Sequence, residues 1–210
     1  MFRICFIDDD DSFEIPLFCE VFGEDFEIVT ATDYAELKSQ IDNRKGWKPD
    51  LFVLDLYFPY RSPNKDKVEA LRAEPLSVEN DNADIRSAYE NYVKAGARLH
   101  SVIDAWNQNA DGGLRLGEKV AADYPRVPIV FYSRKATFED VVRCTAAKNV
   151  WCVERKPTGR SSAETVELTR EARERIGRQF KMAILKIDLG RVERLKRAAE
   201  VLLENLREFN

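Results

Sequence analysis

Short apolar runs alternate along most of the chain with segments in which apolar residues recur at helical spacing. The runs, bounded by turn or charged residues, are typical of buried strands. Strands alternating with helices predict a doubly wound α/β fold built on a parallel sheet. The predicted strands are residues 3–7, 26–29, 51–54, 128–132 and 150–153, and the predicted helices are 12–22, 33–41 (with Thr32 as N-cap), 112–124 and 138–147.

Two segments do not fit this alternation. Residues 60–110 stand where such folds usually place a short loop; the segment begins with the turn-like YRSPNKDK and has helical spacing over 81–107. The tail opens with a capping-box pattern, Ser161 and Glu164, and continues as a helical pattern that we expect to break near Gly190. We therefore predict a domain at 1–160 that contains a helical insertion at about 60–110, followed by a helical C-terminal extension at 161–210.

The extension carries a short apolar heptad pattern. Such a pattern either packs on its own domain or forms a helical contact with a partner, including a homodimer, and the sequence leaves both open. Residues 170–197 are rich in Lys and Arg, but a solvated helix face explains this better than nucleic-acid contact, because no recognised DNA-binding motif accompanies it. The heptad positions are Leu185, Val192, Ala199 and Leu206, with Leu195, Leu202 and Phe209 between them.

Composition narrows the class of protein. A chain of 210 residues with 44% hydrophobic residues can bury a sizeable core, and a net charge of -4 gives no reason to expect nucleic acid or an anionic membrane as partner. No apolar run approaches the roughly 20 residues of a membrane span, and we expect a soluble, cytoplasmic protein. The cysteines form no CxxC pair and are expected to be buried thiols rather than zinc ligands or disulfides.

Polar side chains follow the ends of four predicted strands. Asp8 and Asp9 follow the first strand, Asp55 the third, Ser133 the fourth and Lys156 the fifth. Functional groups gather at the carboxyl edge of a parallel sheet, so we expect these side chains to share one pocket. Clustered carboxylates repel one another and suit Mg²⁺, while an ammonium and a hydroxyl could bind a phosphoryl group.

The order of these motifs resembles one family. The segments FIDDDD, PDLFVLDLYFP, DGG, VPIVFYS and ERKP occur in the order found in response-regulator receiver domains, over residues 1–60 and 110–157. The resemblance implies a flavodoxin-like five-stranded parallel sheet of order 2-1-3-4-5. It also implies a two-component signalling domain, not an enzyme, which receives a phosphoryl group from a histidine kinase or phosphotransfer protein and acts on an unidentified protein target.

The resemblance also implies residue roles. Asp55 matches the aspartate that accepts the phosphoryl group. Asp8 and Asp9 match the acidic pair that binds Mg²⁺, with Asp55 and the backbone carbonyl of Tyr57 as further ligands. Ser133 matches the hydroxyl that follows the phosphoryl group.

Lys156 matches the lysine that contacts the phosphoryl group, and the family implies a cis bond between it and Pro157.

Two positions depart from the family. Val153 stands at the usual aromatic switch position, and Arg134 follows Ser133 where a small residue is usual, so that it would hinder access to an acyl phosphate. The insertion at 60–110 is the third departure. Together these features motivate an alternative, a degenerate receiver that works as a phosphorylation-independent interaction module.

A second alternative is a phosphatase similar to the haloacid dehalogenases. Asp8, Asp10, Ser133 and Lys156 would then be its catalytic residues. This alternative leaves Asp55 without a role, and no strand ending in paired acids follows Lys156. The simpler interpretation of Asp10 is an acidic residue at the start of a helix.

Overall fold

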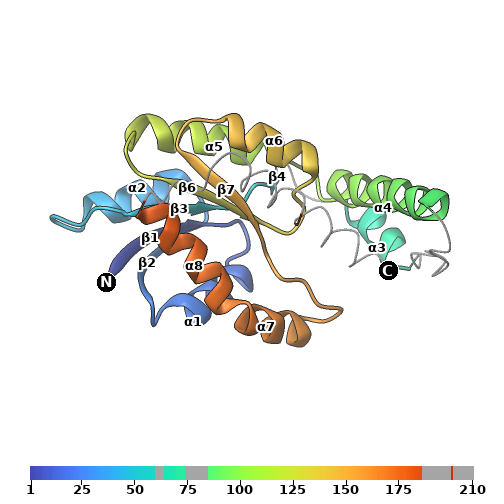
Figure 1. Ribbon diagram of the computed structural model, residues 1–210, viewed down its shortest axis with the longest axis horizontal. Helices are drawn as coiled ribbons and strands as arrows, with labels where there is room; N and C mark the ends of the chain where they lie inside the picture. The colour runs from blue at the N-terminus through green and yellow to red at the C-terminus, as the bar shows by residue number, and fades with distance from the viewer. Residues whose placement is uncertain (60–63, 74–84, 186–199, 201–210) are drawn as a thin grey trace.

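A five-stranded parallel sheet forms the centre of the computed structural model, which describes residues 1–59, 64–73, 85–185 and 200 (Figure 1). The strand order is β2-β1-β3-β6-β7. Counted along this sheet alone, that order is 2-1-3-4-5, so the predicted flavodoxin-like doubly wound fold is confirmed. The strands are β1 (Phe2–Ile7), β2 (Phe26–Ala31), β3 (Leu51–Leu54), β6 (Ile129–Ser133) and β7 (Val150–Arg155).

The sheet separates two hydrophobic cores. Successive residues of a strand point to opposite faces, and β1 shows this alternation. Cys5 and Ile7 belong to one core, Ile4 and Phe6 to the other, and all four are fully buried. Burial on both faces explains why the central strands read as continuous apolar runs in the sequence.

Three helices pack on the first face of the sheet, the upper face in Figure 1. The first of these helices, which starts at Tyr34, has Asp33 as its N-cap, because the Asp33 carboxylate accepts from the Glu36 backbone N–H. The prediction that Thr32 is the N-cap is therefore wrong. Asp33 has the extended conformation of an N-cap, whereas Thr32 donates from its backbone N–H and its hydroxyl to the Glu36 carboxylate. The helices are α2 (Tyr34–Asp42), α5 (Ala110–Asp123) and α6 (Phe138–Ala146).

The opposite face is covered by α1 (Glu14–Phe22), α7 (Ser162–Glu171) and α8 (Arg173–Ile184). Ser161 caps α7 as predicted, by accepting from the Glu164 backbone N–H. The Glu164 carboxylate accepts from the N–H of Arg160 rather than from that of Ser161.

Helix α8 is part of the main core. Ile176 and Phe180 are fully buried, and the Phe180 ring lies 5.4 Å from that of Phe22 and 6.2 Å from that of Tyr132, between ring centroids. Residues 162–184 therefore pack on their own domain, while a domain boundary at residue 160 stays a prediction. The helical pattern breaks at Ala172, between α7 and α8.

The rest of the predicted tail lies outside the described residues. This includes the break at Gly190 and every heptad position except Leu185, whose side chain is exposed. The choice between self-packing and a helical dimer at that pattern therefore stays open.

The insertion begins and ends in a small antiparallel ribbon. Strand β4 (Phe58–Pro59) pairs with β5 (Gln108–Asn109), which brings the two ends of the insertion together beside the main sheet. Between them lie α3 (Lys65–Ala73) and α4 (Ile85–Ala105), which project past the edge of the sheet (Figure 1). The helical pattern predicted at 81–107 is confirmed by α4 over residues 85–105, while residues 81–84 lie outside the described residues and 106–107 form a turn. The turn predicted for YRSPNKDK is wrong from Lys65 onward, where α3 begins, and its first four residues, 60–63, lie outside the described residues.

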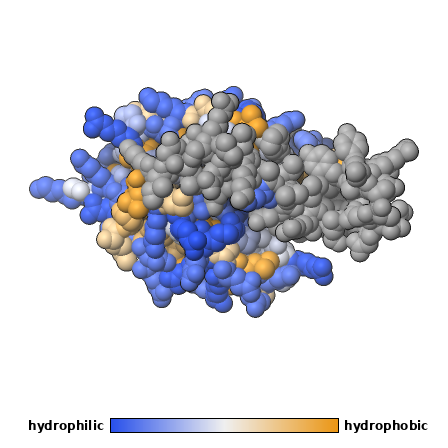
Figure 2. Space-filling view, viewed as in Figure 1, coloured by the Kyte–Doolittle hydropathy of each residue, from blue (hydrophilic) through white to orange (hydrophobic). Residues whose placement is uncertain are grey.

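The face seen in Figure 2 is mainly hydrophilic among the described residues, with apolar side chains in small groups. No helix within the described ranges is long and apolar enough to cross a membrane. None of the four cysteines, all of which lie in the described ranges, forms a disulfide; Cys5, Cys144 and Cys152 are buried, and burial raises the pKa of Cys144 to about 12.

Replacing Phe180 tests the role of α8. We expect Phe180→Ala to lower the free energy of unfolding by about 4 kcal/mol, because the ring fills a core between α1 and the sheet. Leu185→Ala, one residue past the same helix, is the control, and we expect a change within about 0.5 kcal/mol because that side chain is exposed. Urea unfolding of both variants measures the difference; equal effects would show that α8 does not belong to the folded unit.

Candidate functional site

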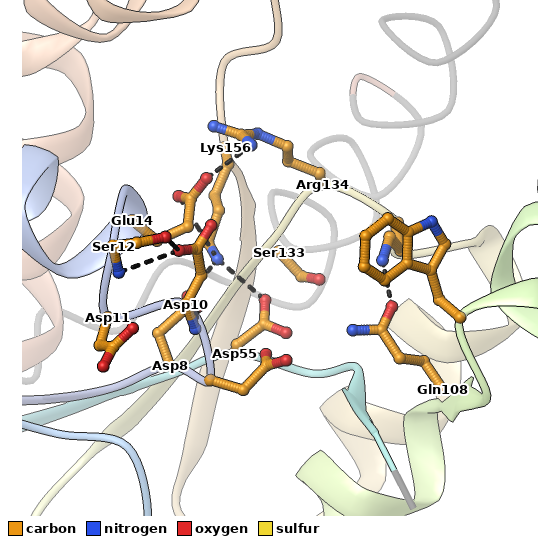
Figure 3. A pocket seen from close by; sticks show the side chains of 13 residues that line it. Asp8, Asp10, Asp11, Ser12, Glu14, Asp55, Gln108, Ser133, Arg134 and Lys156 are labelled. Atoms are coloured by element: carbon orange, nitrogen blue, oxygen red, sulfur yellow. Dashed lines mark hydrogen bonds and ion pairs between the residues drawn. The ribbon is translucent and has the colours of Figure 1, made fainter. Parts of the chain in front are cut away.

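A pocket of about 550 Å³ lies at the carboxyl edge of the parallel sheet. The loops after β1, β3, β6 and β7 contribute to it, and so does the end of the insertion (Figure 3). It therefore brings together the sequence-predicted residues Asp8, Asp9, Asp55, Ser133 and Lys156. The full lining is Asp8, Asp9, Asp10, Asp11, Ser12, Glu14, Asp55, Trp106, Gln108, Ser133, Arg134, Lys135 and Lys156.

Lys156 bridges two buried carboxylates. Its ammonium donates to the Asp8 carboxylate and to Asp55 Oδ1 at 3.0 Å. The three residues are 4%, 2% and 6% exposed, respectively. A third carboxylate, Glu14 Oε2, lies 3.7 Å from the same nitrogen. The lysine is thus the counter-ion that allows these acids to share a buried space.

The electrostatics of the pocket reflect an excess of acid. Burial raises the pKa of Asp8 to about 7; the charge of Asp55 adds to this effect and Lys156 opposes it. Burial, followed by the charge of Asp55, also raises the pKa of Asp9. Burial alone would lower the pKa of Lys156, but the charges of Asp55 and Asp8 outweigh it and raise that pKa. The pocket therefore favours a bound cation.

Backbone contacts fix the carboxylate of Asp55. Its own N–H donates to the Ile7 carbonyl at 2.9 Å, which continues the β1–β3 pairing one residue past β3. The N–H of Tyr57 donates to Asp55 Oδ2 at 2.9 Å. Asp55 Oδ1 faces Lys156, so the two oxygens of the carboxylate have separate partners.

Tyr57 links the loop after β3 to α6. Its hydroxyl donates to Asp140 Oδ2 at 2.5 Å, and both residues are buried. The same Asp140 oxygen accepts from the N–H and the hydroxyl of Thr137, the N-cap of α6. Burial, followed by the hydrogen bond to Asp140, raises the pKa of Tyr57. The sequence indicated a role only for the backbone carbonyl of Tyr57 and gave no sign of this contact.

Ser133 and Lys156 lie side by side at the ends of neighbouring strands. Ser133 pairs with Arg155 in the β6–β7 register, and the Lys156 N–H donates to the Ser133 carbonyl at 3.3 Å. Ser133 is 1% exposed, and Figure 3 shows its side chain beside that of Asp55. The described residues contain no cis peptide bond, so the prediction of a cis bond before Pro157 is wrong. The trans form is the intrinsically preferred one.

The donor set suits Mg²⁺ chemically. Asp8, Asp9 and Asp55 offer hard carboxylate oxygens, and the charge of Asp55 acts unfavourably on both Asp8 and Asp9, which a divalent ion would relieve. In the described part of the chain, no three acidic, histidine or cysteine side chains are already gathered at a metal-binding geometry. The Lys156 ammonium lies between Asp8 and Asp55, which explains this arrangement. A metal ion would therefore need these carboxylates to close around it.

Asp10 has a structural role. Its Oδ1 accepts from the N–H of Ser12, the hydroxyl of Ser12 and the N–H of Phe13, just before α1. These contacts match the interpretation of Asp10 as an acidic residue at a helix start. This structural role gives the phosphatase alternative no support.

Arg134 extends toward α1. Its guanidinium forms an ion pair with Glu14 Oε1 at 2.5 Å and lies 5.6 Å from the Phe13 ring centroid. Val153, the residue at the usual aromatic position, is buried and pairs with Phe131. The pairing of Arg134 with Glu14 was not foreseen, because nothing in the sequence relates the first turn of α1 to the loop after β6.

Receiver domains are among the solved structures that resemble this chain. One is the non-phosphorylated HemR receiver domain from Leptospira biflexa, which is 13% identical with a TM-score of 0.45, covering 88% of this chain and 94% of that one. A CheY-like receiver protein from Methanospirillum hungatei is 15% identical with a TM-score of 0.41, covering 86% and 98%. NtrX from Brucella abortus is 17% identical with a TM-score of 0.43, covering 89% of this chain and 28% of that one.

No protein-family model matches the chain, and no curated protein matches it. The identities above are below 25% and the TM-scores below 0.5. The flavodoxin-like fold follows instead from the 2-1-3-4-5 strand order of this chain, and Asp8, Asp55, Ser133 and Lys156 lie at one edge of its sheet.

Gly113 allows α5 to approach the loop that carries Asp55. A Cβ on Gly113 would lie 2.4 Å from the Leu56 carbonyl oxygen, and the Gly113 N–H donates to that same oxygen at 3.1 Å. We expect Gly113→Ala to destabilise the protein by about 2 kcal/mol or more, since backbone atoms must shift. Gly96→Ala is the matched control, because a Cβ at that position would meet no atom within 4 Å, and we expect a gain of about 0.5 kcal/mol in the helix.

Thermal and urea unfolding of the two glycine variants measure these effects. Destabilisation by Gly96→Ala as large as by Gly113→Ala would contradict the close approach as the cause.

Removing Lys156 tests the charge balance of the pocket. We expect Lys156→Met to lower the free energy of unfolding by about 3 kcal/mol, because Asp8 and Asp55 lose their shared counter-ion. Lys148→Met, at an exposed position before β7, should change it by less than about 0.5 kcal/mol.

A double mutant separates charge repulsion from lost packing. Asp55→Asn in the Lys156→Met background should restore part of the loss, since it removes one of the two carboxylates. Strictly additive effects in urea unfolding would contradict the coupling of the two side chains.

Proposed function

We propose that this protein is a phosphoacceptor signalling domain in which Asp55 accepts a phosphoryl group. One observation carries the proposal. Lys156 holds Asp8 and Asp55 together in a buried pocket, and Ser133 lies at the end of the adjoining strand. A carboxylate with a positioned ammonium and hydroxyl beside it can act as a nucleophile toward a phosphoryl group and stabilise the charge of the product.

The transfer would proceed at one carboxylate oxygen of Asp55. That oxygen forms a bond to phosphorus while the bond from phosphorus to the donor breaks, and the donor leaves with the electron pair. A phosphohistidine of a kinase or phosphotransfer protein is the proposed physiological donor. Lys156 balances the negative charge of the phosphoryl oxygens, and the Ser133 hydroxyl donates a hydrogen bond to one of them.

Asp8, Asp9, Asp55 and the Tyr57 carbonyl would hold Mg²⁺. The ion would neutralise phosphoryl oxygens, a requirement in a pocket where burial and the charge of Asp55 already raise the pKa values of Asp8 and Asp9. The reaction changes this protein once and gives no turnover, so the proposed role is signalling to a protein target rather than enzymatic catalysis. The target reads a change in the population of pocket conformations.

Acetyl phosphate tests the proposal without a kinase. With Mg²⁺ present, we expect one phosphoryl group per chain by intact mass spectrometry, mapped to the peptide that contains Asp55. The modification should be absent in Asp55→Asn, since the amide is not a nucleophile, and should be lost when the metal is chelated. Asp42→Asn, an exposed aspartate at the end of α2, is the control and should be modified as the wild type is.

Two outcomes would contradict the proposal. Modification that persists in Asp55→Asn would place the acceptor elsewhere. A folded wild-type protein that neither accepts a phosphoryl group nor binds beryllofluoride with Mg²⁺ would favour the interaction module that works without phosphorylation.

A further inference from the structure

The cations of the pocket differ in their partners. Lys156 is matched by Asp8 and Asp55, and Arg134 is matched by Glu14. Lys135 forms no ion pair with a carboxylate in the described parts of the chain; its ammonium donates to the amide oxygen of Gln108, a neutral group. A cation with a neutral partner retains its full charge for an incoming anion.

Lys135 is placed to act on the acceptor residue. It lines the same pocket as Asp55 and is held two residues after Ser133. Asp9 lines this pocket too. Burial lowers the pKa of Lys135, while the charges of Asp55 and Asp9 oppose that effect. A phosphoryl group on Asp55 would bring additional negative charge toward this ammonium.

The partners of Lys135 come from the insertion. Gln108 belongs to β5, and the Trp106 ring centroid lies 6.0 Å from the Lys135 ammonium. Figure 3 shows Gln108 across the pocket from Glu14. Because β5 pairs with β4, which begins three residues after Asp55, the wall formed by Trp106 and Gln108 is attached to the acceptor loop as well as to α4.

We propose that Lys135 is a second cationic ligand for the phosphoryl group on Asp55, and that its transfer from Gln108 to the phosphoryl oxygens reports phosphorylation to the insertion. This inference rests on the proposed function. It assigns a role to residues outside the six to which the sequence gave a role in the site, and it makes the insertion part of the response. Arg134 is less suited to this role, because taking it would break the ion pair of Arg134 with Glu14 Oε1.

The chemical step adds negative charge at Asp55, and Lys135 forms no covalent bond in it. As the Asp55 oxygen bonds to the phosphorus of acetyl phosphate, the bond to acetate breaks and acetate leaves with the electron pair. Lys135 donates hydrogen bonds to phosphoryl oxygens and transfers no proton. The hydrogen bond to Gln108 is lost in the same event, which changes the surroundings of the Trp106 ring.

The test compares Lys135→Gln with the wild type and with Lys148→Gln. Both variants lose one positive charge, but Lys148 precedes the amino end of β7, at the edge of the sheet opposite the pocket. With acetyl phosphate and Mg²⁺, we expect Lys135→Gln to be phosphorylated about tenfold more slowly, in line with the loss of one charged donor. Lys148→Gln should match the wild type, and Lys135→Arg should recover most of the rate.

Tryptophan fluorescence tests whether phosphorylation changes the surroundings of Trp106 in the insertion. Beryllofluoride with Mg²⁺ should change the emission of Trp106, isolated as the difference between the wild type and Trp106→Phe. The change should be absent in Lys135→Gln at saturating beryllofluoride. Thermal unfolding of each variant shows that the folded protein is being compared.

The outcomes separate the two proposals. Equal rates for Lys135→Gln and Lys148→Gln, in a protein that is phosphorylated, overturn the role of Lys135 and leave Asp55 as acceptor. Slower phosphorylation of Lys135→Gln, with no change in the Trp106 emission of the wild type, overturns the proposal that phosphorylation is transmitted to the insertion. If neither the wild type nor any variant is phosphorylated or binds beryllofluoride with Mg²⁺, the proposed function is overturned and this inference with it.

Discussion

The shared ion pair of Lys156 with Asp8 and Asp55 is the interaction on which the rest of the site depends. Two buried carboxylates cannot remain close without a counter-charge, and a buried ammonium is equally costly alone. Each charge is therefore stable only because the others are present. The arrangement is also what a phosphoryl acceptor needs, since it positions a nucleophile, leaves acidic oxygens for a metal ion and supplies a cation for the product.

The fold places these groups at one edge of the sheet. Parallel strands end at the same edge, and the register that pairs Ile7 with Leu54 and Ser133 with Arg155 sets Asp8, Asp55 and Lys156 within contact distance. The two cores fix that register, because a shift of one residue would move apolar side chains from one buried face to the other. Helix α8 belongs to this framework through Phe180, so residues well beyond β7 contribute to the stability of the site.

The sequence was sufficient to predict the structure where a local pattern of residues is compatible with only one kind of element. Continuous apolar runs predicted the five strands, and the polar residues at their ends predicted the pocket, because both follow from sheet geometry. It was insufficient where contacts join segments distant in the chain. Glu14 with Arg134, Gln108 with Lys135, and Tyr57 with Asp140 are each separated by tens of residues and carry no local pattern. The N-cap of α2 was predicted at Thr32, one residue before the actual N-cap Asp33, because threonine and aspartate can both cap a helix. Of the two residues that differ from the family pattern, Val153 is buried on a strand and Arg134 forms an ion pair with α1. The insertion contributes one wall of the pocket.

We expect Lys156 to exchange its contact with free carboxylates for a contact with a phosphoryl group on Asp55. Side-chain NMR of lysine labelled with ¹⁵N and ¹³C observes this directly. We expect the Lys156 ammonium to be charged and slowly exchanging in the metal-free protein, and its signals to shift when Mg²⁺ and beryllofluoride are added to the wild type but not to Asp55→Asn. Lys156 signals that are unchanged in the wild type under saturating beryllofluoride would contradict the account.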